Sequence, residues 1–109
     1  MKKLWELLVP TVMDRGNGLV PIKVKYHRVW DEKVRKITHG MTILTPVKGA
    51  WVSPNDKLFV ERMIPVRIYC TTEEINLIAD MSAMYYNQEA IMYYALSDEV
   101  KIKYYKKEI

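Results

Sequence analysis

The feature that most constrains this chain is the stretch at residues 57–70 (KLFVERMIPVRIYC), whose side chains alternate in character. Its even positions form one apolar face that only Arg62 interrupts. Its odd positions include Glu61, Met63, Arg67 and Tyr69. Residues two apart along a β-strand lie on the same face of a sheet. The pattern therefore predicts a long strand with one buried face and one face free for an interface or a ligand.

Two other stretches have the period of an amphipathic helix. Residues 24–38 place their apolar side chains on a single stripe made of Tyr26, Trp30, Val34 and Ile37. A helix stop follows at residues 39–40, with Gly40 available for the left-handed position. Residues 72–86 open with a threonine cap and two acids, where the helix dipole favours negative charge. We therefore expect two helices, over residues 24–38 and 72–86.

The remaining apolar stretches predict strands at residues 4–13, 41–45, 88–96 and 100–105. The turn sequence SPND at 53–56 predicts a hairpin that folds residues 50–52 onto the strand at 57–70. The resulting order is that of an α+β, ferredoxin-like βαββαβ sandwich, with two helices on one face of an antiparallel sheet. Residues 100–105, guarded by lysines, would add an extra C-terminal edge strand. We expect one domain over residues 1–109.

The second face of this sheet has no helix to cover it. Met63, Tyr69 and one of Tyr93 or Tyr94 would form an exposed apolar patch there, and such patches mark interfaces. We therefore expect a homo-oligomer, with a dimer as its smallest unit. Because Pro65 donates no ladder hydrogen bond, we also expect a bulge or bend in the long strand near residues 63–65.

Composition excludes several classes of function. Seventeen Lys and Arg against thirteen Asp and Glu give a net charge of +4, which suits a small anionic partner better than duplex nucleic acid. No apolar run reaches the length of a membrane span or a signal peptide core, so we expect a cytoplasmic protein that does not bind membranes. One cysteine and two isolated histidines predict neither a disulfide nor a metal site, and no cofactor motif occurs.

A search for catalytic motifs finds no glycine-flanked nucleophile and no Ser, His and Asp set. The sequence therefore predicts a protein that is not an enzyme, with no catalytic residues. Two alternatives stay open. One is a small ferredoxin-like isomerase or lyase that uses His27 and Glu61 as an acid–base pair. The other is an interaction module whose open sheet binds a host protein.

Basic and aromatic residues give the positive signal for ligand binding. Arginine forks bind phosphate oxygens and aromatic rings stack on bases, which together favour a nucleotide ligand. The candidate binding residues are Tyr26, Arg28, Lys48, Trp51, Arg62, Arg67 and Tyr93. Within this set, Arg62 and Lys48 would hold phosphates, with help from Arg28, and Trp51 or a tyrosine would stack a base. The alternative is that the arginines form ion pairs across a subunit interface.

Three segments, ITHGMTIL, GAWVSP and ERMIPVRI, carry a resemblance that extends over nearly the whole chain. The sequence resembles small proteins of unknown-function type encoded by tailed bacteriophages. More narrowly, it is similar to the phage anti-CBASS sponge proteins. This resemblance implies that the protein sequesters a cyclic dinucleotide or cyclic oligonucleotide signal without cleaving it, in the cytoplasm of an infected cell. No binding residue is assigned from the resemblance.

Overall fold

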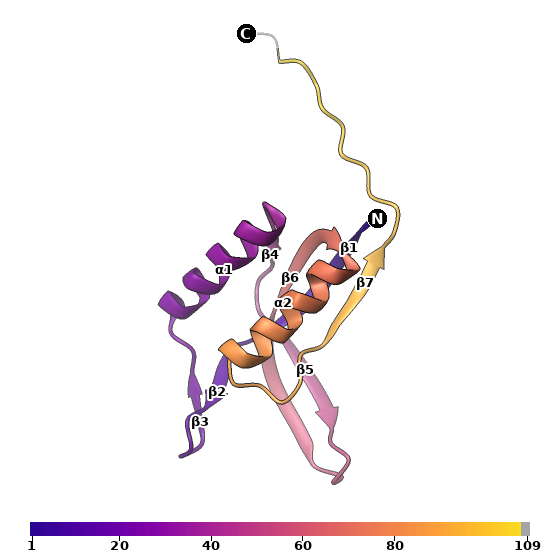
Figure 1. Cartoon of the computed structure of the whole chain (residues 1–109). Coiled ribbons are helices and arrows are strands. Elements are labelled where there is room, and N and C mark those ends of the chain that lie inside the picture. The colour runs from indigo at the N-terminus through magenta and orange to yellow at the C-terminus, as the bar shows by residue number, and fades with distance from the viewer. Residues whose placement is uncertain (108–109) are drawn as a thin grey trace.

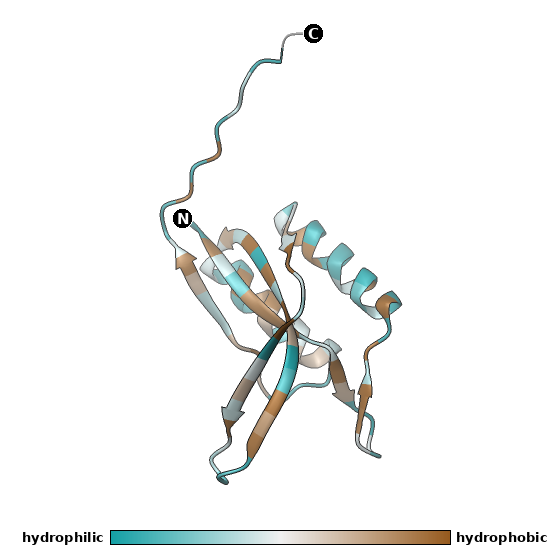
Figure 2. Cartoon of the chain, turned by 180° about the vertical axis from the view of Figure 1, so that it is seen from behind, coloured by the Kyte–Doolittle hydropathy of each residue, from teal (hydrophilic) through white to brown (hydrophobic). Residues whose placement is uncertain are grey.

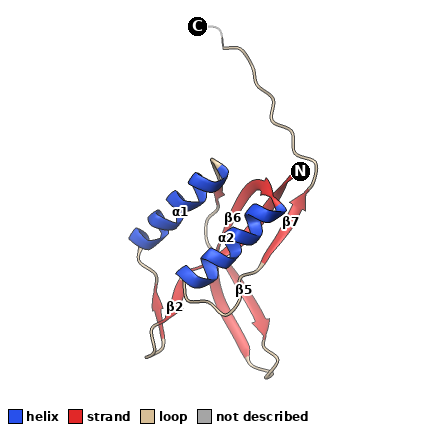
Figure 3. Ribbon diagram, viewed as in Figure 1, coloured by secondary structure: helices blue, strands red, loops and turns tan. Residues whose placement is uncertain are grey.

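The computed structural model describes residues 1–107. These residues form a curved sheet with two helices packed against one of its faces (Figures 1 and 3). In chain order the elements are β1 (Lys2–Pro10), β2 (Val12–Asp14), β3 (Leu19–Pro21), α1 (Val24–Thr38), β4 (Thr42–Ile43), β5 (Val47–Val52), β6 (Leu58–Thr71), α2 (Thr72–Tyr85) and β7 (Tyr93–Ser97). The predicted α+β, ferredoxin-like class is confirmed.

Strand β6 organises the main sheet. The strand order is β4-β6-β1-β7, with β5 also paired to β6, and all of these pairings are antiparallel. Along its C-terminal half β6 pairs with β1, from Met63 opposite Pro10 to Thr71 opposite Lys2. Its N-terminal half pairs with β5 instead. Strands β2 and β3 form a separate hairpin that leads into α1 (Figure 1).

The core lies between the helices and the sheet. Its buried side chains include Leu7, Val9, Val66, Ile68 and Cys70 from the strands and Trp30, Val34, Ile75 and Ile78 from the helices. Polar groups in this layer are satisfied, since Trp30 Nε1 donates to Ser82 Oγ at 2.8 Å and Ser82 Oγ donates to the Ile78 carbonyl at 2.6 Å. The C-terminal part of the predicted apolar face of β6, which includes Val66 and Ile68, therefore packs against the predicted stripes of the two helices.

The predicted hairpin is present and longer than expected, because β5 begins at Val47. Its turn is held by backbone hydrogen bonds from Ser53 N–H to the Lys57 carbonyl and from Asp56 N–H to the Ser53 carbonyl, both 2.9 Å. The helix ends differ in detail from the prediction. His39, not Gly40, takes the left-handed conformation after α1 (φ 68°). Thr71, not Thr72, caps α2, accepting a hydrogen bond from the Glu74 N–H.

Of the bulge or bend predicted near residues 63–65, the bulge is absent. The register between β1 and β6 runs without a break through Leu8 opposite Pro65. The reason lies on the other side of β6, where β5 pairs only as far as Met63 and the β4 ladder starts at Val66. Pro65 therefore lies where β6 changes partners and no ladder donor is required, and its carbonyl accepts from the Leu44 N–H at 2.9 Å.

The predicted edge strand at residues 100–105 is also wrong. Residues 98–107 contain no strand and extend away from the domain (Figure 1). Ser97 redirects the chain there: its Oγ accepts from the Glu99 N–H at 3.0 Å and donates to the Glu99 carbonyl at 2.9 Å. Residues 100–105 therefore have the alternating pattern of a strand, but they do not pair with another strand among the described residues.

Candidate functional site: the open sheet face and its arm

The sheet face opposite the helices is left uncovered by the elements of the chain, as the view from behind shows (Figure 2). Because Val66 and Ile68 point into the core, the alternating neighbours Arg67 and Tyr69 lie on the opposite face. Residues paired with them share that face, namely Glu6 opposite Arg67 and Leu4 opposite Tyr69. We call this surface the open face.

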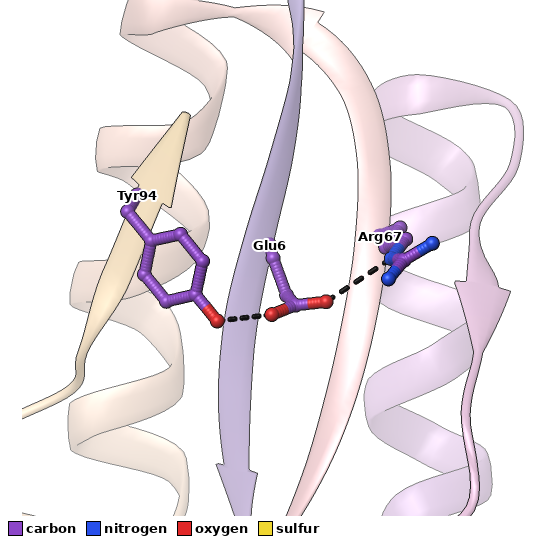
Figure 4. Close-up of polar contacts among 3 residues, drawn as sticks. All are labelled: Glu6, Arg67 and Tyr94. Carbon is purple, nitrogen blue, oxygen red and sulfur yellow. Dashed lines mark hydrogen bonds and ion pairs between the residues drawn. The ribbon is translucent and has the colours of Figure 1, made fainter. Parts of the chain in front are cut away.

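A polar cluster occupies the middle of the open face (Figure 4). Glu6 of β1 accepts a hydrogen bond from Arg67 Nε of β6 at 3.1 Å through its Oε1. Its Oε2 accepts a short hydrogen bond from the Tyr94 hydroxyl of β7. Glu6 is only 8 % exposed. One carboxylate therefore joins three neighbouring strands across the sheet.

This cluster links the strands of the sheet and is not suited to acid–base catalysis. The hydrogen bond from Tyr94 lowers the pKa of Glu6, burial opposes that effect, and Arg67 lowers the pKa further. The same hydrogen bond raises the pKa of the Tyr94 phenol. A carboxylate with both oxygens engaged and a lowered pKa is a poor general base. The alternative for the arginines was an ion pair across a subunit interface; Arg67 has its ion pair within one chain, with Glu6.

The second part of the surface is a two-stranded arm, residues 47–63, which consists of β5, its turn and the start of β6. The arm projects beyond the helices (Figure 1). Its apolar side chains are substantially exposed: Val47, Trp51, Val52, Leu58 and Val60. The Trp51 and Phe59 rings stack on one face, with centroids 4.7 Å apart, while Val52, Leu58 and Val60 lie on the other face. The arm is therefore apolar on both faces.

Only part of the predicted binding set is brought together. Lys48 and Arg62 lie directly opposite each other in the β5–β6 register. Trp51 lies further along the same arm but, because side chains alternate along a strand, on the opposite face from these two cations. Arg67 is on the open face, where Glu6 already neutralises it. Arg28 lies exposed on α1, which is not part of the arm. The predicted phosphate pair therefore exists as two adjacent, exposed cations.

The two predicted tyrosines lie elsewhere. Tyr93 alternates with Tyr94, so it faces the helices, and its hydroxyl donates to Asn76 Oδ1 of α2 at 2.7 Å. Tyr26 is in the first turn of α1, beside Arg15 and Lys25. These two tyrosines and the arm lie on different elements and do not form one site. The prediction grouped them by their chemistry, since the sequence does not show which elements separate them.

The alternative acid–base pair is not assembled. His27 Nδ1 lies 2.7 Å from the Tyr86 hydroxyl, whereas Glu61 lies on the arm opposite Gly49. Burial lowers the pKa of His27, with a partial opposing effect from Asp31. Cys70 is also unsuited to chemistry, because burial raises the pKa of its thiol to about 11.

Sequence reasoning missed Glu6, and it named Tyr94 only as one of two tyrosines that could lie on the open face. One signal was available for Glu6, which is the only acid in the apolar stretch LWELLVP. An acid in such a strand needs a partner, and Arg67 is the matching charge on β6. The register that aligns residues 6, 67 and 94 was not accessible, because it depends on the packing of three strands far apart in the sequence.

The described residues contain neither a metal-binding cluster nor a membrane-spanning helix. Among residues 1–107, no cluster of three or more His, Cys, Asp or Glu side chains has the geometry to hold a metal ion. Within the same residues, neither helix is long and apolar enough to cross a membrane.

Comparison with known proteins adds information about the fold. No family model and no curated protein matches the chain. Among solved structures, the divalent cation tolerance protein CutA1 of Thermus thermophilus superposes with a TM-score of 0.66 at 10 % identity, covering 93 % of this chain and 88 % of that one. The periplasmic divalent cation tolerance protein CutA of Archaeoglobus fulgidus gives 0.66 at 11 % identity, covering 94 % and 89 %.

A third match is CutA of Synechococcus elongatus PCC7942, with a TM-score of 0.57 at 11 % identity, covering 88 % of this chain and 75 % of that one. These matches contradict the predicted function, the sequestration of a nucleotide signal by a phage sponge, because the fold is shared with proteins of another kind. That prediction is wrong. The resemblance to phage proteins was a separate inference and stays a prediction.

Proposed function

We propose that this protein is a non-enzymatic homo-oligomer in which the arm and the open face form the contacts between subunits. The observation that carries the proposal is the arm, whose apolar side chains are exposed on both faces; Leu58 is 65 % and Val60 54 % exposed. A two-stranded hairpin is marginally stable in water by itself. Contiguous exposed apolar surface of this kind is typical of interfaces.

Hydrogen bonding supports the same proposal. Within the described residues β5 pairs only with β6, so its outer edge presents backbone groups without a strand partner. On the other side of the arm, the Arg62 carbonyl accepts from Thr11 Oγ1 at 2.7 Å, and the β6 residues before it pair only with β5. Open strand edges are templates for pairing with another chain. A second copy supplies matching antiparallel edges, including the outer edge of β7.

Charge also fits an assembled arm. Lys48 and Arg62 face each other directly across the β5–β6 ladder. Like charges in this position are unfavourable in an isolated hairpin. An acidic group from a neighbouring subunit would relieve the repulsion, which favours a partner that places a carboxylate at the base of the arm.

The test is the mass of the protein in solution, with two matched variants. Leu58 of the arm and Leu77 of α2 are both exposed leucines, at 65 % and 55 %. We expect light scattering at micromolar concentration to give a multiple of the 12.9 kDa chain for the wild type and for Leu77→Glu. Leu58→Glu should shift the mass toward a single chain. A monomeric wild type, or equal masses for both variants, would contradict the proposal.

A second candidate function is a role in divalent cation tolerance. The observation that favours it is the likeness of fold over nearly the full length of two proteins that bear this name. One chain has no metal-binding cluster among its described residues, so we expect a cation to bind only where subunits meet. Cation binding should then depend on assembly.

Calorimetry with Zn²⁺ and Mn²⁺ on metal-free protein tests this role. We expect binding by the wild type and by Leu77→Glu, and loss of binding by Leu58→Glu. Equal binding by both variants would show that the site does not need the arm. The absence of binding by the assembled wild type would reject cation binding and leave the oligomer proposal intact.

A further inference from the structure

We infer that a cavity at the end of the molecule formed by the β2–β3 hairpin, the start of α1 and the end of α2 binds a small aromatic carboxylate. The cavity has a volume of about 340 Å³. This volume lies at the lower end of the range for small-molecule sites. Its lining includes none of the residues of the arm and none of the Glu6 cluster. The inference is therefore independent of how the chain assembles.

The walls of the cavity are fixed by hydrogen bonds between elements. The Tyr85 hydroxyl of α2 donates to the Tyr26 carbonyl of α1 at 2.9 Å. Asn87, after α2, donates from Nδ2 to the Asp14 carbonyl at the end of β2 at 3.3 Å. Tyr86, which is 1 % exposed, contributes to the base. A site whose walls are already in place loses little freedom when a ligand binds.

Two tyrosine rings give the cavity an aromatic character, and cations lie over both. For Tyr26, the Arg15 guanidinium carbon is 6.0 Å and the Lys25 Nζ 5.3 Å from the ring centroid. For Tyr85, the Lys33 Nζ is 5.1 Å from the ring centroid. The first turn of α1 contains no acidic residue to offset these charges. Three cations therefore lie over the two aromatic rings, against one acid, Asp14, in the lining of the cavity.

The titration of the tyrosines agrees with this charge. The Arg15 guanidinium is the main cause that lowers the pKa of Tyr26, and Lys25 adds to it. Burial raises the pKa of Tyr85, so that its hydroxyl stays a donor to the Tyr26 carbonyl. Positive charge that lowers the pKa of a phenol also favours an anionic ligand.

The lining selects the class of ligand. Met13, Ile22 and Tyr86 offer an apolar base for a ring, and the tyrosine rings offer faces for stacking. Arg15 has the planar fork that matches a carboxylate. Asp14 lines the same cavity and opposes any ligand with several negative charges. A planar monocarboxylate therefore fits better than a polyanion.

The experiment uses 4-hydroxybenzoate as the probe and 4-hydroxybenzamide as its uncharged control, each titrated into ¹⁵N-labelled full-length protein. We expect the backbone amides of Arg15, Tyr26 and Asn87 to shift in a saturable way with the carboxylate. The amide probe should bind at least about tenfold more weakly, since it lacks the charge that Arg15 recognises. Equal affinities for the two probes, or no shift at these amides, would overturn the inference.

Two variants of equal charge locate the site. Arg15→Gln removes the guanidinium in an exposed turn, and Lys103→Gln removes one charge from the extended tail. The backbone hydrogen bond from Arg15 N–H to the Gly18 carbonyl does not involve the side chain, so the hairpin should fold in Arg15→Gln. We expect Arg15→Gln to weaken 4-hydroxybenzoate binding by about ten- to hundredfold and Lys103→Gln to leave it unchanged. Equal effects of the two variants would also overturn the inference.

Discussion

The two halves of β6 have the same alternating pattern in different surroundings. Val66 lies in the half that pairs with β1 and is 1 % exposed, because the helices pack over it. Val60 lies six positions earlier, at the same phase of the alternation, and is 54 % exposed, because neither described helix reaches the arm. The pattern predicts that a strand forms. Whether its apolar face is buried within the chain depends on the length of the layer that covers it.

The largest expected difference between the halves is in core packing. Val66→Ala removes two buried methyl groups and leaves a cavity, so it should lower the free energy of unfolding by about 2–3 kcal/mol. Val60→Ala in the arm should change the unfolding of an isolated subunit by less than about 0.5 kcal/mol. Denaturant titration measures both values.

Protein concentration sharpens this test. If the arm lies in a subunit interface, the loss caused by Val60→Ala should grow as protein concentration rises, because association stabilises the wild type by mass action. The loss caused by Val66→Ala should not depend on concentration. The same small loss for Val60→Ala at every concentration would argue against an interface at the arm.

The contrast also explains how far the sequence could predict the molecule. The period of residues 57–70 and the stripes of the two helices were sufficient for the fold class, because helices and sheet bury each other through those side chains. The prediction of an edge strand at residues 100–105 was wrong, since an alternating pattern does not by itself provide a neighbouring strand to pair with. An apolar residue on the arm and one in the core look the same in sequence.

The candidate site was less accessible for a related reason. Lys48, Trp51 and Arg62 lie in one hairpin, because a local turn sets their register, but strand alternation puts Trp51 on the opposite face from the two cations. Tyr26, Arg28 and Tyr93 were separated from them by tertiary packing. The contact of Glu6 with Tyr94 joins residues at opposite ends of the chain, and local patterns carry no information about such a pairing.

Two acids, Glu6 of β1 and Glu61 of β6, differ in their contacts with the two halves of β6. Glu6 forms a salt bridge with Arg67, which lies in the half of β6 that pairs with β1. Glu61 belongs to the arm and has no salt bridge among the described residues. Glu6→Gln should cost about 1.5–3 kcal/mol at pH 7, the range for hydrogen bonds to a charged group. Glu61→Gln should cost less than about 0.5 kcal/mol.

The pH dependence identifies the cause of this loss. The folded protein lowers the pKa of Glu6 below its ordinary value of 4.5, so the ionised form stabilises the fold above that pH. The stabilisation should disappear as the pH falls through the lowered pKa, because wild-type Glu6 is then protonated too. The difference between wild type and Glu6→Gln, measured by chemical denaturation, should therefore shrink as the pH falls below about 4.5. A difference that stays constant with pH would point to packing instead of charge.

The smallest expected differences in stability are between variants at the two ends of β6. At its C-terminal end, Thr71 Oγ1 accepts from the Glu74 N–H at 3.1 Å, and Glu74 Oε1 accepts from the Thr71 N–H at 2.9 Å, which completes a capping box. Before its N-terminal end, Ser53 Oγ accepts from the Lys57 N–H at 3.3 Å in an exposed turn. Thr71→Ala leaves a donor at the start of a packed helix without its partner and should cost about 1 kcal/mol. Ser53→Ala should cost a few tenths of that, since water replaces the hydroxyl in the turn. Equal losses of stability for the two variants in thermal unfolding would mean that the helix cap contributes no more to stability than the hydrogen bond in the turn.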